Sequence, residues 1–95
     1  MIALRTLRSF WASHPDAVEP LQAWHDGVRA EQWRTAADAL LQFPHVSVLN
    51  DRRLVFSIGG NKYRLVVKVH YKTKTVFVRF IGTHADYDRI DANTV

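Results

Sequence analysis

The sequence predicts an α+β fold in which N-terminal helices pack on one face of an antiparallel β-sheet. Two observations lead to this expectation. Apolar residues recur at helical spacing as far as Gln42, and after Pro44 their period changes to two, as in strands. Helices followed by a run of strands indicate an α+β layout. The 95 residues are expected to form one domain, 1–95.

Two helices are expected in the first third of the chain. The first runs from Leu4 to His14-Pro15, because the residue before a proline is pushed out of the α region. The second follows Asp16, which we expect to cap it, with Glu19 at the capping-box position. It carries an apolar stripe and ends near Ala30.

A third, shorter helix is expected to begin at Thr35 as its cap, with Asp38 at the capping-box position. It ends near Gln42, before Phe43-Pro44. The side chains expected to pack inward from this region are those of Trp33, Ala36, Leu40 and Leu41.

The second half of the chain is expected to be a series of antiparallel strands joined by turns, because β-branched and aromatic residues alternate with polar ones. Asn50-Asp51-Arg52 is a turn by composition, and Gly59-Gly60-Asn61 is a strong hairpin signal. The expected strands are a short one at Val46 and Val48, one through Leu54, Phe56 and Ile58, a long one from Lys62 to Tyr71, and a last one from Thr75 to Ile81.

Alternation gives the long strand two different faces. The apolar face, expected to point to the core, carries Tyr63, Leu65, Val67, Val69 and Tyr71. The opposite face carries Lys62, Arg64, Val66, Lys68 and His70. That many cations on one face favour contact with an anion.

The loop before the last strand decides whether Arg79 joins this cationic face. Any even loop places Arg79 with Arg64 and Lys68. A two-residue loop at Tyr71-Lys72 sets Arg64 opposite Arg79, whereas one at Thr73-Lys74 sets Lys68 opposite Arg79. Like charges facing each other destabilise a sheet, so either arrangement favours a binding role. The alternative is a solvated outer face whose cations discourage edge pairing.

Composition narrows the function classes. The formal charge of +4 favours nucleic acid or an acidic protein as partner. The sequence contains no cysteine, which excludes disulfides and thiolate metal sites, and its histidines show no metal-ligand spacing. No metal, no cofactor and no membrane contact are therefore expected, and a cytoplasmic location is the default.

His84 is the most informative of the histidines. It follows Gly82-Thr83 at the end of the last predicted strand, lies near Tyr87, and falls in the stretch 83–90 that is expected to form a turn of helix. A strand end can present a side chain to a ligand, which suggests acid–base chemistry. A capping or surface role explains the same position.

Two runs of residues carry a resemblance to a known family. Asn61 to Lys68 and Arg79 to Asp88 resemble the HigB branch of the RelE-like toxins. The similarity continues through Phe10-Trp11, the stretch 14–17 and the helix around Trp24, and so covers nearly the whole chain.

This resemblance implies the toxin of a type II toxin–antitoxin pair, a ribosome-dependent mRNA interferase. Such endoribonucleases cleave translated mRNA in the ribosomal A site without metal, by attack of the RNA 2′-OH on the adjacent phosphate. The implied partners are mRNA, the ribosome and a helix-turn-helix antitoxin. The alternative is a non-catalytic binding or inhibitor toxin of the same fold, for example one directed at gyrase, or a nucleic-acid-binding module.

The resemblance also implies residue roles. Arg64 falls on the arginine that contacts the scissile phosphate, and His84 falls where some members have an arginine and others a catalytic histidine. The best-known members carry two lysines on the preceding strand, where this sequence has Val55 and Ser57. The catalytic candidates are Arg64, Lys68, Arg79, His84 and Tyr87, and the RNA-binding candidates are Lys62, Arg64, Lys68, His70 and Arg79.

Overall fold

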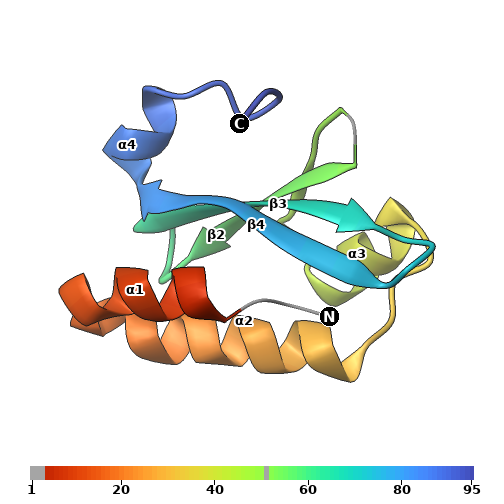
Figure 1. The fold of residues 1–95 in the computed structure, drawn as a ribbon, viewed down its shortest axis with the longest axis horizontal. Helices are drawn as coiled ribbons and strands as arrows, with labels where there is room; N and C mark the ends of the chain where they lie inside the picture. The colour runs from red at the N-terminus through yellow and green to blue at the C-terminus, as the bar shows by residue number, and fades with distance from the viewer. Residues whose placement is uncertain (1–3, 51) are drawn as a thin grey trace.

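The computed structural model describes residues 4–50 and 52–95. Asp51 of the predicted turn lies outside these ranges, and so do the first three residues, for which the sequence suggests either a short strand or the entry to a helix. Figure 1 shows the arrangement of the elements. In chain order they are α1 (Arg5–Ser13), the 3-10 turn η1 (Pro15–Ala17), α2 (Val18–Ala30), α3 (Ala36–Gln42), β1 (Ser47–Val48), β2 (Arg53–Ile58), β3 (Tyr63–His70), β4 (Thr75–Thr83) and α4 (His84–Asp88).

The sheet separates two unequal layers. Across the described residues its strands follow the order β1-β2-β3-β4, and every neighbouring pair is antiparallel. Helices α1 and α2 lie under one face, which we call the inner face, while α4 and the C-terminal residues lie above the other, the outer face (Figure 1). The predicted α+β class, with the N-terminal helices on one face, is confirmed.

The main core lies between the inner face and the helices. Leu65, Val67 and Val69 of β3 are fully buried, which confirms the face assignment made from alternation. Leu7 of α1 and Leu21 of α2 are also fully buried against the strands. Aromatic rings fill the space near α2, where the Trp24 ring meets the Phe56 ring edge-on at a centroid distance of 5.4 Å. Because these contacts cover the inner face, only the outer face of the sheet can hold a functional site.

The helix boundaries match the predicted ones closely, but the expected cap of α2 is wrong. Asp16 lies inside η1, and α2 begins two residues later, at Val18. The Asp16 carboxylate instead accepts hydrogen bonds from the Lys62 ammonium and the Tyr63 hydroxyl. These donors hold the pKa of Asp16 below its ordinary value. Asp16 therefore bonds to the residues at the start of β3 and does not cap α2.

The α3 helix has the predicted capping box of Thr35 and Asp38, and Ala36 packs against the core as expected, but the two leucines do not face inward. Leu41 is 83% exposed and Leu40 is also exposed, whereas Ala39 is fully buried. Trp33 precedes the helix and fills the core itself, with its indole N–H donating to Gln42 Oε1 at 2.9 Å. The small side chain of Ala39 lets α3 approach closely and turns the leucines outward.

The turn between β2 and β3 has the conformation that its composition predicts. Gly59, Gly60 and Asn61 all have positive φ, at 63°, 63° and 78°. Glycine and asparagine tolerate this left-handed region better than other residues. The turn pairs Ile58 with Tyr63 and so sets the register of the two strands.

The register of β3 and β4 differs from both arrangements considered from sequence. His70 pairs with Thr75, so the loop has four residues, 71–74, and is even as expected. Arg64 lies opposite Gly82 and Lys68 opposite Phe77. A β-bulge shifts the register between Val66, which pairs with Phe80, and Val67, which pairs with Val78; Arg79 is therefore the extra residue. Neither Arg64 nor Lys68 faces Arg79, so the expected like-charge pair is wrong.

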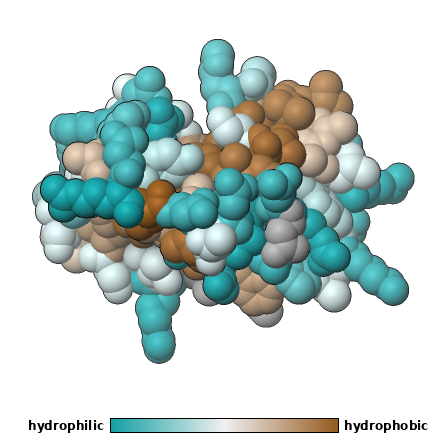
Figure 2. Space-filling view, turned by 90° about the horizontal axis from the view of Figure 1, so that it is seen from above, coloured by the Kyte–Doolittle hydropathy of each residue, from teal (hydrophilic) through white to brown (hydrophobic). Residues whose placement is uncertain are grey.

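The outer face also has an apolar centre, which was not expected from the cations on this side of the long strand. Val55 and Val66 are buried there against Ala92, with Phe80, Tyr87 and Val95 packed around them. In Figure 2, which looks onto this face, apolar surface lies among hydrophilic side chains that project outward. The outer face is therefore a cationic rim around a small second core.

Candidate active site

Arg64 is the best-positioned cation of the outer face. It lies on β3 opposite Ser57 of β2 and Gly82 of β4, and it is half-buried. Its Nη1 donates to Ser57 Oγ and, at 2.9 Å, to Asn61 Oδ1. A guanidinium has several N–H donors, so these two bonds fix its plane and leave donors for an anion.

Gly82, opposite Arg64 in the sheet, lets Phe80 and Asp86 pack closely against the β4 backbone. A Cβ atom at this position would lie 2.7 Å from Cζ of Phe80 and 3.1 Å from Cβ of Asp86. The first distance is shorter than any ordinary contact of a Cβ atom, and the second is unusually short. A side chain here would therefore force the Phe80 ring and the start of α4 to move. The glycine thus allows α4 to begin directly beside the strand that carries Arg64.

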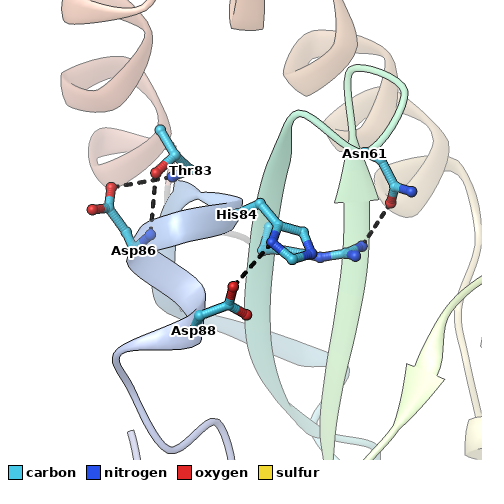
Figure 3. Close-up of polar contacts among 6 residues, drawn as sticks. Asn61, Thr83, His84, Asp86 and Asp88 are labelled. Carbon is cyan, nitrogen blue, oxygen red and sulfur yellow. Dashed lines mark hydrogen bonds and ion pairs between the residues drawn. The ribbon is translucent and has the colours of Figure 1, made fainter.

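A capping box fixes the first residue of α4 and therefore the direction in which the side chains of this helix project. Asp86 N–H donates to Thr83 Oγ1 at 3.1 Å, and Thr83 N–H donates to Asp86 Oδ2 at 3.2 Å (Figure 3). His84 is the first residue of the helix, and its Nδ1 lies 3.3 Å from Asp88 Oδ2, one turn further on. The His84 ring projects from α4 on the side where Asn61 lies (Figure 3).

Tyr87 connects α4 with Arg64. Its ring centroid lies 5.9 Å from Arg64 Cζ, within the range of a cation–π contact. Its ring also packs on the outer-face cluster of Val55 and Val66, so its position is fixed by burial. The structure therefore brings two of the predicted catalytic residues, Arg64 and Tyr87, into contact at the end of the sheet next to α4, and His84 lies on the same short helix as Tyr87.

Lys68 and His70 lie towards the other end of the same face. Lys68 is four residues along β3 from Arg64, which at ~3.3 Å per residue is about 13 Å. It faces Phe77 of β4, and the His70 ring meets the Phe77 ring edge-on with centroids 5.1 Å apart. These two predicted RNA-binding residues form a separate group from the one around Arg64.

Arg79 lies between the two groups, beside the C-terminal tail, by which we mean residues 91–95. Its Nε donates to the main-chain oxygen of Val95 at 3.4 Å. Arg53 of β2 donates to the same oxygen from Nε at 3.2 Å and from Nη2 at 3.0 Å. The tail thus lies over the centre of the outer face, held by arginines from two strands.

The face predicted for Lys62 is wrong. The residue lies in the turn before β3, and its ammonium pairs with Asp16 in the helical layer. This contact raises the pKa of Lys62 above its ordinary value. A contribution of Lys62 to RNA binding stays a prediction, but the structure places it apart from Arg64.

Sequence reasoning gave no role to several residues that the structure places at these sites. Asp88 could have been found, because it follows His84 by four residues in a predicted turn of helix, where side chains meet. The contact of Ser57 with Arg64 depends on strand register and has no local signal. The residues without a predicted role are Arg53, Ser57, Asn61, Phe77 and Asp88.

Among residues 4–50 and 52–95, no group of three or more His, Cys, Asp or Glu side chains is arranged to hold a metal ion. Within the same ranges, no helix has the length and apolar character needed to cross a membrane.

Helices lie under a four-stranded antiparallel sheet whose outer face carries several cations, and this layout is consistent with the fold of the RelE-like toxins. Residues 17–90 match the family model HigB_toxin, described as the RelE-like toxic component of a toxin–antitoxin system. The chain belongs to this family, and the resemblance noted in its sequence is confirmed.

Curated relatives carry names consistent with this family. The chain is 24% identical over 79 residues to mRNA interferase HigB of Escherichia coli O6:H1 strain CFT073, a match that covers 81% of this chain and 77% of the relative. It is 37% identical over 38 residues to mRNA interferase toxin HigB of Escherichia coli strain K12, covering 40% of this chain and 36% of the relative. An mRNA interferase HigB of Shigella flexneri matches to the same extent.

Proposed function

We propose that this protein is an mRNA interferase toxin that cleaves translated mRNA on the ribosome. The observation that carries the proposal is the placement of Arg64 between Ser57 and Asn61, with Tyr87 of α4 in contact with its guanidinium and His84 on the same short helix. An arginine fixed at an open surface suits a phosphate, and a histidine and a tyrosine supply groups that exchange protons. The names of the curated relatives support the same activity.

The proposed reaction is attack of the RNA 2′-OH on the adjacent phosphate. The phosphorus–5′-oxygen bond breaks, one fragment keeps a 2′,3′-cyclic phosphate, and the other leaves with a 5′-hydroxyl. Arg64 stabilises the charge that develops on the phosphate oxygens, and Arg79 adds a second cation nearby. His84 accepts the 2′-OH proton through Nε2, because Nδ1 faces Asp88.

The leaving 5′-oxygen needs a proton donor. Lys68 and Tyr87 are the two candidates from the sequence. Tyr87 contacts Arg64, whereas Lys68 is about 13 Å further along β3, so the proposal assigns this role to Tyr87. Lys68 then acts in RNA binding with His70.

The same proposal includes the partners and the place of action. As a member of a toxin family, the chain has an antitoxin partner. We propose that this antitoxin is a helix-turn-helix protein and that the toxin acts in the cytoplasm, where mRNA is translated.

Primer extension on a translated message tests the activity. His84→Gln removes the proton acceptor and should lower cleavage by about 10²–10⁴-fold while ribosome binding is kept. Arg64→Ala should lower cleavage and also weaken binding, because a phosphate contact is lost. His45→Gln and Arg8→Ala, at exposed positions outside the site, are the matched controls.

Two results would contradict the proposal. If His84→Gln and Arg64→Ala cleave as well as the controls, the site has been assigned to the wrong residues. If the unaltered protein binds ribosomes but leaves every message intact, it is a binding toxin and not a nuclease.

A further inference from the structure

The exposed ring of Phe77 is the least explained apolar group on the outer face. Phe77 is 44% exposed, and among the described residues it belongs to neither apolar cluster of the fold. It lies on β4, an edge strand of the sheet, with its side chain on the same face as Lys68. Core packing therefore gives no reason for an aromatic residue here.

The neighbours of Phe77 make it a defined platform. The His70 ring meets it edge-on, with an interplanar angle of 74° and a centroid distance of 5.1 Å, and so limits its rotation. Lys68 lies directly opposite on β3. An aromatic face supported on one side and exposed to solvent, with a cation alongside, is how proteins stack the bases of single-stranded nucleic acid.

We propose that Phe77, supported by His70, stacks an unpaired base of the bound RNA. This base belongs to a different nucleotide from the one that is cleaved, because Phe77 is paired with Lys68, about 13 Å along the sheet from Arg64. Exposed Arg79 lies between Phe77 and Gly82 on β4, so the cation that supports the reacting phosphate also lies beside the path of the RNA backbone towards Phe77. The RNA strand would then run along β4, past the C-terminal tail.

This inference rests on the proposed function for the identity of the ligand, but it concerns binding and not chemistry. The sheet end beside α4 positions the reacting phosphate, and the Phe77 platform holds a neighbouring base. Two separated contacts on one strand of RNA would fix its direction across the face. Stacking accepts any base, so the platform would add affinity with little sequence preference.

The experiment measures stacking without cleavage. RNA carries the fluorescent base 2-aminopurine at successive positions, with 2′-deoxy nucleotides throughout the A-site codon to prevent the reaction. It is mixed with the protein alone and, separately, with 70S ribosomes programmed with the same RNA. Stacking on Phe77 should quench the fluorescence at one position outside the cleaved step.

The key variant is Phe77→Leu, which keeps an apolar side chain of similar size on the strand but removes the aromatic face. It should abolish the quenching and weaken binding about tenfold, since base–aromatic stacking is worth ~1–3 kcal/mol and 1.4 kcal/mol is a factor of ten. Phe77→Trp, which keeps an aromatic face, should retain both the quenching and the affinity. Val48→Leu, at an apolar residue of similar exposure on β1, should behave as the unaltered protein.

A second measurement tests the contact itself. An abasic nucleotide at the quenched position should weaken binding to the unaltered protein but have no further effect on Phe77→Leu, because the two changes remove the same interaction. Independent effects at every position would show that Phe77 stacks no base, and so would unquenched fluorescence with the unaltered protein. If Phe77→Leu weakens only antitoxin binding, the platform is a protein contact and the inference is wrong.

The outcomes separate this inference from the proposed function. Quenching at one position with no cleavage of an all-ribose message would overturn the nuclease proposal and keep the platform. Normal cleavage with equal RNA affinity of Phe77→Leu and the unaltered protein would overturn the platform and keep the nuclease.

Discussion

Arg64 shows how a single residue can be prepared for an anion. Its guanidinium is bonded to Ser57 and Asn61 before any ligand is present, and Tyr87 contacts it from α4. A group that is already oriented loses less freedom when it binds, so more of the interaction energy remains for the phosphate that we propose as its ligand. Ser57, which lies opposite Arg64 in the sheet, accepts one of the two hydrogen bonds that orient the guanidinium.

His84 is oriented by a second residue, Asp88, which leads to a prediction at this scale. Because Nδ1 lies 3.3 Å from Asp88 Oδ2, we expect Nδ1 to carry the proton of the neutral ring and Nε2 to be the nitrogen left to accept one. Asp88→Ala should lower cleavage about tenfold, while ribosome binding stays unchanged. The ¹⁵N shifts of the His84 ring should show a changed mixture of tautomers, which a purely structural role would not produce.

Asp26→Ala is the matched control for that experiment. Asp26 is also an exposed carboxylate near a histidine, with Oδ1 3.9 Å from His25 Nδ1, but it lies on α2 away from the outer face. Equal cleavage by Asp88→Ala and Asp26→Ala would show that Asp88 does not position His84.

At the scale of elements, the contact of Asp16 with Lys62 and Tyr63 ties η1 to the start of β3. Because the pKa of Asp16 is lowered in the folded protein, its stabilising effect is fully present above its ordinary pKa of about 3.9 and is lost as the pH falls through the lowered value. The raised pKa of Lys62 has the opposite sense, so its effect is lost only at strongly alkaline pH.

Asp16→Asn should therefore lower the urea midpoint of unfolding at pH 7, and the difference from the unaltered protein should shrink as the pH falls through the lowered pKa of Asp16. Both side chains are largely exposed, so the effect should be small. Asp38→Asn, in the capping box of α3, controls for the loss of a carboxylate elsewhere. A difference between the two proteins that is the same at pH 7 and at pH 2 would contradict this account.

For the molecule as a whole, the inner face of β3 decides whether the fold exists. Val67 is fully buried between the helices and the sheet. Val67→Asp should unfold the protein, because an unpaired buried charge costs several kcal/mol out of the ~5–15 kcal/mol that stabilises a small domain. Val48→Asp, at a valine of β1 that is 48% exposed, should stay folded by circular dichroism. A cooperative melt for Val67→Asp near that of the unaltered protein would refute the assignment.

The distribution of charge over the molecule predicts a salt dependence. Ribosome affinity should fall steeply with salt, because phosphate contacts release counterions. Lys68→Ala should reduce the slope by about one unit. Lys62→Ala should change it less, because Asp16 already offsets that charge. Co-sedimentation at several salt concentrations measures both, and a salt-independent affinity would argue against a surface that reads phosphates.

Local patterns in the sequence determined the elements and the two faces of β3. Helical spacing and proline positions located α1, α2 and α3, and the glycine turn before Tyr63 set a hairpin whose alternation correctly buried Leu65 and Val67. These features depend on residues close together in the chain, where sterics and period act directly. The arginine on the outer face, the histidine after the last strand and the family resemblance followed from the same local information.

Contacts between distant segments decided the rest. The bulge at Arg79 removed the expected like-charge pair. Asp16 bonds to Lys62 and Tyr63 instead of capping α2, and Ala39 packs in the core in place of the leucines of α3. In each case a tertiary contact outweighed a local preference, and only the local preference can be read from the sequence. Likewise, only the packed sheet shows that Ser57 orients Arg64 and that Phe77 is exposed beside His70, because pairing across strands places residues together that no local pattern connects.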